Sequence, residues 1–295
     1  MSVEIRDPRF ASVVGPDIAF ERIATGCLFT EGPLWHPRDH YLLWSDMPGD
    51  HLRRWSVKGG VTTFRKPCNM SNGLTWDRQG RLVACEHASS QVSRTEADGR
   101  ITPLATHYQG KQLNSPNDIV CAADGGIYFS DPPYGRAEFY GVKRDQELPF
   151  QGVYRVGADP KSPTLLLDDF DRPNGLCFSL DGRRLFINDT ARQHIRVFDV
   201  RADGTLGGGR VWAETTGEGP GAPDGMKLDS AGNVYCCGPG GIHVFTPEAR
   251  CLGVIHVPEH TANMAWGDAD CRSFYITAST SVYRLRVLVP GLPVF

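Results

Sequence analysis

Apolar and polar residues alternate along most of the chain in short runs that are typical of β-strands. A turn of Asp, Gly or Asn separates paired runs, as Asp181-Gly182 does within the stretch RPNGLCFSLDGRRLFIND at residues 172–189. Such a dipeptide between two apolar runs is a strong indication of a β-hairpin. The pattern therefore predicts a chain built mostly from antiparallel strands.

The same pattern recurs six times along the sequence. Each copy begins with a polar residue and continues with an apolar strand, a turn and a second strand, and a third strand follows in most copies. The polar residues, called anchors below, lie roughly 40 to 57 residues apart, which is close to the period of propeller blades. The anchors are Glu31, Asn72, Asn117, Asn174, Asp224 and Asn263.

A four-stranded unit repeated at this period predicts an all-β fold, a six-bladed β-propeller with a metal site in its central channel. Helical repeats have similar periods, but frequent Val, Ile, Tyr and Phe, interrupted by Gly, favour strands. We expect residues 1–295 to form one domain, with a strand near residues 17–25 closing the last blade. Two long spacings mark insertions at residues 135–150 and 201–223.

Composition excludes several classes of partner and suggests a compartment. The net charge is -3 and no Lys/Arg cluster occurs, so we expect neither nucleic acid nor a membrane as partner. The N-terminal segment lacks the apolar core of a secretory signal, and the nine cysteines include no CxxC pair. We therefore expect reduced thiols and a cytoplasmic protein. The role of the adjacent Cys236-Cys237 and the oligomeric state stay open.

The anchors are the main candidates for chemistry. The first strand of every propeller blade lines the channel, so the anchors are expected to form a ring. One Asn-Gly alone is most simply a turn, but all six anchors carry a side-chain oxygen. Carboxylate and amide oxygens without His or Cys suit one hard divalent cation, and Glu31 and Asp224 would balance its charge. Calcium is the cation that we expect, with Mg²⁺, Mn²⁺, Zn²⁺ and Fe²⁺ as alternatives.

Four motifs around the anchors resemble those of the SMP-30/gluconolactonase/LRE family: TEGPLW, SPNDI, RPNGLCFS with its following DG, and APDGMKLD. SDPPYG and VACEH are similar to its microbial gluconolactonase branch. The resemblance runs from about residue 20 to the last blade and implies a six-bladed propeller that hydrolyses sugar lactones with one divalent metal. Matched by motif, it implies that Glu31, Asn174 and Asp224 are metal ligands, and that Asn117 is a fourth ligand or a substrate contact.

Two departures limit what the resemblance implies. Some animal members have Arg-Phe before the matching Asn-Asp, whereas this chain has Ser115-Pro116, so their sugar specificity cannot be transferred. Paraoxonase-like relatives carry histidine at the anchor that matches Asn72. Asparagine cannot accept a proton in this role, which moves the general base to another residue.

Further candidates lie in the loops that follow the second strand of a blade, because these loops open onto the anchor face. They carry Asp46, His87, Tyr134, Asp189 and Cys237. His87 could bind a substrate hydroxyl, although a lone histidine is more often structural. Tyr134, in a loop stiffened by proline, could stack on a ligand or hydrogen-bond to it. Asn72 and Asn117 are expected to orient the substrate.

These observations predict a divalent-metal-dependent lactonase that opens a small-molecule sugar aldonolactone, similar in size to gluconolactone, to the aldonic acid. The metal would polarise the lactone carbonyl, and Asp224 would take a proton from water and return it to the ring oxygen. Asp224 is preferred to Glu31 as the catalytic base because the family resemblance points there. The aldonolactone and the native metal stay open.

Two alternatives remain from the sequence. One is a phosphotriesterase-type hydrolase on the same scaffold, as in the similar diisopropyl-fluorophosphatase. The other is a non-enzymatic propeller that binds a partner protein and holds a structural metal, because fold alone does not determine function. An interaction scaffold has no need for two carboxylates in a narrow channel, so the ring of anchors favours an enzyme.

Overall fold

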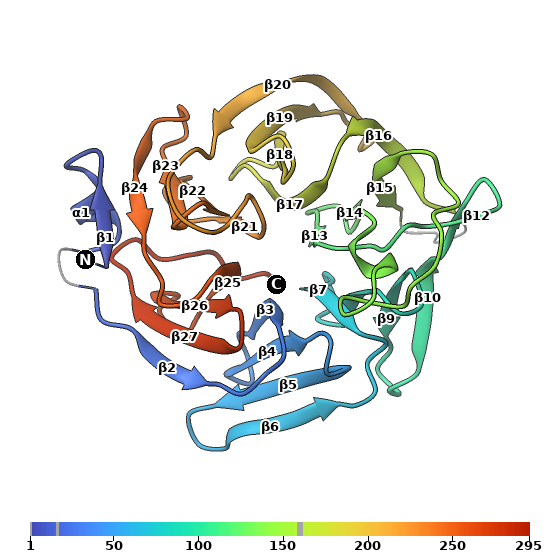
Figure 1. The fold of residues 1–295 in the computed structure, drawn as a ribbon, viewed down its shortest axis with the longest axis horizontal. Coiled ribbons are helices and arrows are strands. Elements are labelled where there is room, and N and C mark those ends of the chain that lie inside the picture. Colours follow the sequence, from blue (N-terminus) through green and yellow to red (C-terminus); the bar gives the residue numbers. More distant parts are fainter. Residues whose placement is uncertain (1, 16–17, 158–161) are drawn as a thin grey trace.

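Six antiparallel sheets are arranged like blades around a central channel (Figure 1). The structure is a computed structural model and describes residues 2–15, 18–157 and 162–295. The innermost strand of each blade begins near an anchor, and the chain visits the blades in sequence order. The prediction of an all-β, six-bladed β-propeller is therefore confirmed.

The first four blades each contain four consecutive strands, with the first strand innermost. The first blade consists of β3 (Thr30–His36), β4 (Tyr41–Asp46), β5 (His51–Ser56) and β6 (Gly60–Arg65). The second consists of β7 (Ser71–Trp76), β8 (Leu82–Glu86), β9 (Gln91–Thr95) and β10 (Ile101–Ala105). The third consists of β13 (Ile119–Cys121), β14 (Ile127–Asp131), β15 (Gln151–Val156) and β16 (Thr164–Phe170). The fourth consists of β17 (Pro173–Phe178), β18 (Arg184–Asp189), β19 (His194–Val200) and β20 (Leu206–Glu214).

The last two blades each take a strand from the start of the chain. The fifth consists of β21 (Met226–Leu228), β22 (Val234–Gly238), β23 (Gly241–Phe245), β24 (Cys251–Ile255) and, outermost, β1 (Val3–Ile5). The sixth consists of β25 (Thr261–Gly267), β26 (Ser273–Ala278), β27 (Ser281–Arg286) and, outermost, β2 (Glu21–Ala24). Pairing of β2 with β27 joins the first and last parts of the chain and closes the ring. Residue 17, the first of the segment 17–25 expected to close the ring, lies outside the described residues.

Three short elements complete the described chain. They are α1 (Phe10–Val13), the 3₁₀ turn η1 (Tyr134–Arg136) and a hairpin of β11 (His107–Tyr108) and β12 (Lys111–Gln112). Phe10 in α1 is fully buried against the last two blades, so α1 seals their outer junction. Within the described residues, no helix is long and apolar enough to cross a membrane.

The core lies mainly between neighbouring blades, because each sheet buries its faces against the next. Trp35 of the first blade stacks on Tyr275 of the last, with ring centroids 5.4 Å apart. All nine cysteines are free thiols. Cys236 and Cys237 are adjacent in β22, so their side chains point to opposite faces of the sheet and pack into different core clusters. This placement gives the adjacent cysteines a packing role.

The glycines that follow four of the anchors allow the inner strands to approach one another closely. A Cβ atom on Gly175 would lie 2.2 Å from the main-chain oxygen of Asp224, and one on Gly32 would lie 2.1 Å from that of Asn72. Gly73 and Gly225 are similarly crowded by the next anchor segment. Of the four, only Gly32 has a positive φ. Close packing of the ring, more than turn geometry, therefore explains the glycine after an anchor.

Candidate functional site

A cavity of about 170 Å³ lies at the end of the channel where the anchors begin the inner strands. All seven site residues that the sequence indicated line this cavity: Glu31, Asn72, His87, Asn117, Tyr134, Asn174 and Asp224. Seven further lining residues were not singled out from the sequence: Phe29, Met47, Tyr140, Thr190, Ala222, Pro223 and His260. The sixth anchor, Asn263, is absent from this lining and instead contacts Glu31.

Three aspartates at the ends of second strands fix the loops that lead into the anchors. Asp46 accepts a hydrogen bond from the Leu28 amide at 2.8 Å, and Asp189 accepts one from the Arg172 amide at 3.0 Å. Asp131 accepts bonds from the amides of residues 114 and 115, each at 2.8 Å. Asp46 and Asp189 therefore stabilise the backbone of these loops and do not line the cavity. Cys237 is buried in the hydrophobic core. Of the five loop candidates, only His87 and Tyr134 reach the cavity.

Glu31 is a buried carboxylate with a fixed orientation. Its Oε2 accepts hydrogen bonds from the Gly32 amide at 2.7 Å and from Asn263 Nδ2 at 3.2 Å. Burial, together with the nearby charge of Asp118, raises the pKa of Glu31 to about 7. The carboxylate form of Glu31 is thus costly unless a positive charge lies beside it.

Asp224 faces the same cavity from the fifth blade and is half-buried. Its main-chain oxygen accepts a hydrogen bond from Asn188 Nδ2 at 2.5 Å, which fixes the backbone. Burial raises the pKa of Asp224 well above its usual value, and the charges of Glu31 and Asp118 raise it further. Two carboxyl groups that disfavour each other's ionisation form a site that a cation stabilises.

Asn174 provides the clearest test of whether this site fits a metal ion. Its Nδ2 donates to Thr190 Oγ1 at 3.2 Å, and the Thr190 hydroxyl donates in turn to the Pro223 carbonyl at 2.6 Å. The amide is therefore oriented, and its Oδ1 is buried without a hydrogen-bond partner in the described part of the chain. Buried oxygens rarely lack a partner, and one that lines the same cavity as two carboxyl groups suits a hard cation. The residues present thus fit a divalent metal.

Amide oxygens make up half of the donor set that Glu31, Asn117, Asn174 and Asp224 could offer a metal ion. Among the described residues, no three His, Cys, Asp or Glu side chains are grouped so as to hold a metal. A site at the anchors therefore depends on the oxygens of Asn117 and Asn174 as well as on the two carboxylates. Such an all-oxygen, mixed set is suited to Ca²⁺ or Mg²⁺ more than to softer metals.

His87 is buried beneath the insertion of residues 135–150. Its Nδ1 lies 2.8 Å from the Tyr140 carbonyl and its Nε2 lies 3.1 Å from Asn72 Nδ2. Burial, helped by the positive charge of Arg144, lowers the pKa of His87 to about 4. His87 is therefore neutral near pH 7.

The insertion of residues 135–150 forms one wall of the cavity. Tyr140 packs edge-to-face on Phe29 with ring centroids 5.4 Å apart, and Arg144 donates to the His87 carbonyl at 2.7 Å. Tyr134, just before the insertion, lies beneath the Arg172 guanidinium. The guanidinium carbon of Arg172 is 5.6 Å from the centroid of the Tyr134 ring. The insertion length was visible in the sequence, but which of its side chains turn inward was not.

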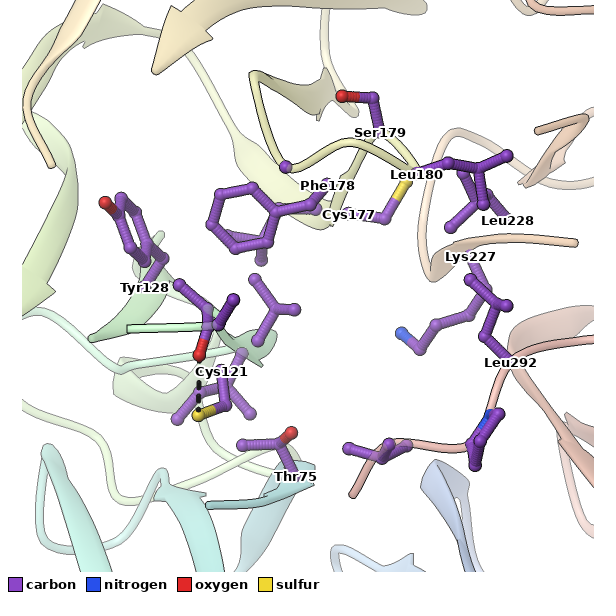
Figure 2. Close-up of a pocket in the computed structure, with 18 of the residues that line it drawn as sticks. Thr75, Cys121, Tyr128, Cys177, Phe178, Ser179, Leu180, Lys227, Leu228 and Leu292 are labelled. Atoms are coloured by element: carbon purple, nitrogen blue, oxygen red, sulfur yellow. Dashed lines mark hydrogen bonds between the residues drawn. The ribbon is translucent and has the colours of Figure 1, made fainter. Parts of the chain in front are cut away.

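A second and larger cavity has a volume of about 550 Å³ (Figure 2). Its lining includes residues of the inner strands that follow the anchors in the sequence. Its lining is mostly apolar and includes the C-terminal residues Leu292 and Val294. The C-terminus lies near the centre of the ring in Figure 1. Lys227 extends into this cavity and is 3.6 Å from Asp118.

Comparison with known proteins identifies the family. The model of the family described as "SMP-30/Gluconolactonase/LRE-like region" matches residues 29–280. The chain is 30% identical to a gluconolactonase of Zymomonas mobilis, over 96% of this chain and 85% of that protein. It is 26% identical to a pentonolactonase of Haloferax volcanii, over 92% of this chain and 96% of that protein.

Solved structures agree with this assignment. A gluconolactonase of Xanthomonas campestris has a TM-score of 0.89 and 32% identity, covering 97% of this chain and 95% of that one. A regucalcin of Agrobacterium tumefaciens, described as a calcium-binding protein, has a TM-score of 0.78 and 20% identity over 94% of this chain and 96% of that one, which shows a shared fold. The family predicted from the sequence is thus confirmed, and the chain belongs to the SMP-30/gluconolactonase/LRE-like family.

Proposed function

We propose that this protein is a divalent-metal-dependent lactonase that hydrolyses a sugar aldonolactone to the aldonic acid. The observation that carries the proposal is the unpartnered, buried Oδ1 of Asn174 beside the carboxyl groups of Glu31 and Asp224. Relatives named gluconolactonase, pentonolactonase and L-arabinolactonase support a sugar lactone as the substrate.

The size and lining of the cavity support a substrate of about one sugar unit. A volume of about 170 Å³ has room for roughly six water molecules or one small ligand. Asn72 and Asn117 present amide groups to sugar hydroxyls, while Tyr134 and Tyr140 present ring surface. This combination of polar groups and aromatic surface suits a small polyhydroxylated ring.

In this proposal the metal is held by Glu31, Asn117, Asn174 and Asp224. Calcium is the cation that we favour, and Mg²⁺, Mn²⁺, Zn²⁺ and Fe²⁺ are the alternatives to test. When bound, the cation supplies Lewis-acid stabilisation of the negative charge that develops on the lactone carbonyl oxygen. Glu31 serves only as a ligand, because two donors already fix its Oε2.

Asp224 is the residue that we propose as the general base. It is the more exposed of the two acids and faces the cavity. Asp224 takes a proton from the water whose oxygen attacks the lactone carbonyl carbon, and returns it to the ring oxygen as the acyl–oxygen bond breaks. Asn72, Asn117 and Tyr134 hold the sugar hydroxyls in place during these steps.

Removal of the metal, combined with a substrate panel, tests the proposal. Protein treated with chelator and dialysed would be assayed for ring opening of glucono-1,5-lactone, a pentonolactone and a phosphotriester, with spontaneous opening subtracted. We expect lactone turnover to fall to background and to return when Ca²⁺, Mg²⁺, Mn²⁺ or Zn²⁺ is added. Unchanged turnover without metal would contradict the metal dependence, and preference for the phosphotriester would contradict the substrate class.

A further inference from the structure

Asp118 is a buried carboxylate in the channel that the proposed reaction does not use. It follows anchor Asn117 at the position where four other anchors are followed by glycine. Asp118 is 3% exposed, and its Oδ2 has no hydrogen-bond partner within the described residues. Lys227 Nζ lies 3.6 Å from this oxygen, so the two residues form an ion pair.

Lys227 is connected to the proposed metal site through one amide side chain. Its Nζ donates to Asn263 Oδ1 at 3.5 Å and to the Met226 carbonyl at 3.2 Å. Asn263 Nδ2 donates in turn to Glu31 Oε2 at 3.2 Å. Lys227 lines the larger cavity shown in Figure 2 and is absent from the lining of the smaller one. Any effect of Lys227 on the reaction is therefore electrostatic and does not require contact with substrate.

The net charge of the side chains in this part of the channel follows from counting its carboxylate and ammonium groups. Three carboxyl groups lie in this part of the channel: Glu31 and Asp224 line the smaller cavity, and Asp118 directly follows the anchor Asn117. The ammonium group of Lys227 lies among them, 3.6 Å from Asp118 and within hydrogen-bond distance of Asn263. One ammonium against three carboxylates leaves two negative charges, which is the charge that one divalent cation balances.

We propose that Lys227 and Asp118 form a built-in charge pair that sets the net charge of the metal site and thereby its affinity for cations. The inference rests on the proposed function, because it assumes that the anchors bind a metal. Lys227 is a positioning residue in this view. Its ammonium keeps the third carboxylate from adding to the charge that the bound cation must balance.

Isothermal titration calorimetry with Ca²⁺, on chelated protein at pH 8, tests this proposal without an activity assay. We expect Lys227→Met to bind Ca²⁺ about tenfold more tightly than the unaltered protein, and Asp118→Asn about tenfold more weakly, because each changes the site by one charge. The double variant restores the original charge and should bind with nearly the original affinity. Lys227→Arg keeps the charge and should do the same.

A matched control removes a paired cation away from the channel. Arg196 forms an ion pair with Asp169 at 2.8 Å on outer strands of the third and fourth blades, and Arg196→Met should leave Ca²⁺ affinity unchanged. Circular dichroism of each chelated variant checks folding. If Lys227→Met fails to fold, weaker binding by Asp118→Asn with recovery in the double variant still tests the proposal.

The outcomes separate this inference from the proposed function. Equal Ca²⁺ affinities in the unaltered protein and all folded variants would overturn the charge-pair proposal and leave the metal site standing. Weaker binding by Lys227→Met would also overturn it. If the unaltered protein binds none of the divalent cations, the proposed metal site itself is wrong.

Discussion

Asn72 donates a hydrogen bond to His87, with Asn72 Nδ2 3.1 Å from the imidazole Nε2. The direction of this bond follows from the other side of the ring, where Nδ1 lies 2.8 Å from the Tyr140 carbonyl. A carbonyl only accepts, so Nδ1 carries the proton and Nε2 of the neutral ring accepts. His87 thereby orients the Asn72 amide and leaves its Oδ1 as the acceptor for a ligand. We infer that His87 positions a substrate contact.

Substitution of His87 tests this role. Gln can donate to Tyr140 and accept from Asn72, so His87→Gln should retain turnover within a few-fold. His87→Leu leaves both partners unsatisfied, which costs about 1–3 kcal/mol of stability, and we expect KM for the lactone to rise more than kcat falls. Steady-state kinetics and thermal melts of both variants provide the comparison. Equal loss in Gln and Leu variants would show that the imidazole itself is needed.

The pKa of His87 predicts a specific acid sensitivity. Burial lowers the pKa of His87 to about 4 from the 6.5 of a free histidine side chain, so the folded state binds fewer protons than the unfolded state between these values. The stability that this residue contributes is complete above pH 6.5 and is lost as the pH falls toward 4. From pH 7 to 4.5, the original protein should lose about 2–3 kcal/mol more than His87→Gln. Denaturant titrations at both pH values measure this difference, and equal losses would contradict the assignment.

Asp224→Asn separates metal binding from proton transfer. The change keeps one oxygen ligand but removes a charge and the base, so metal-saturated turnover should stay roughly 10²–10⁴-fold below the original. Asn174→Asp is the control, because it adds a charge, should tighten metal binding and leaves the base in place. Turnover of both variants is measured across a metal titration. Recovery of Asp224→Asn at saturating metal would show that Asp224 is only a ligand.

Gly175→Ala tests whether the tight ring positions the site. The added methyl would lie 2.2 Å from the Asp224 carbonyl, so the fifth-blade anchor segment must shift. We expect a loss of about 1–3 kcal/mol of stability together with weaker metal binding. Gly157→Ala is a matched control, because among the described residues its new Cβ would meet Arg155 Nη1 alone, at 3.6 Å. Similar melting temperatures and metal affinities in the two variants would contradict this account.

Much of the fold could be predicted because it depends on local, repeated patterns. The turn at Asp181-Gly182 and the alternation around it specify a hairpin, and six copies specify blades. The pairing of β1 with the fifth blade, unlike the closing strand expected near residues 17–25, depends on contacts that no local pattern encodes. The outermost strand β1 beside β24 illustrates this, because Val3–Ile5 is too short to give a periodic signal.

The candidate site shows the same division. The anchors could be found because each of them begins a repeat. Among the six anchors, Glu31 and Asp224 are the only acidic residues. The ion pair between Asp118 and Lys227 was not predicted. Nothing in the sequence indicates that side chains 109 positions apart lie 3.6 Å from each other. Tyr140 lies in an insertion without periodicity, so its contact with Phe29 could be seen only in three dimensions.

The most direct test of the central claim measures bound metal and lactone turnover on the same samples. Chelated protein would be reloaded with increasing Ca²⁺, or with the cation that best restores activity, and freed of unbound metal. Metal content per chain and ring opening of an aldonolactone would then be determined. The account predicts that turnover rises in proportion to bound metal and reaches its maximum at one ion per chain. Full turnover by chains that hold almost no metal would contradict it.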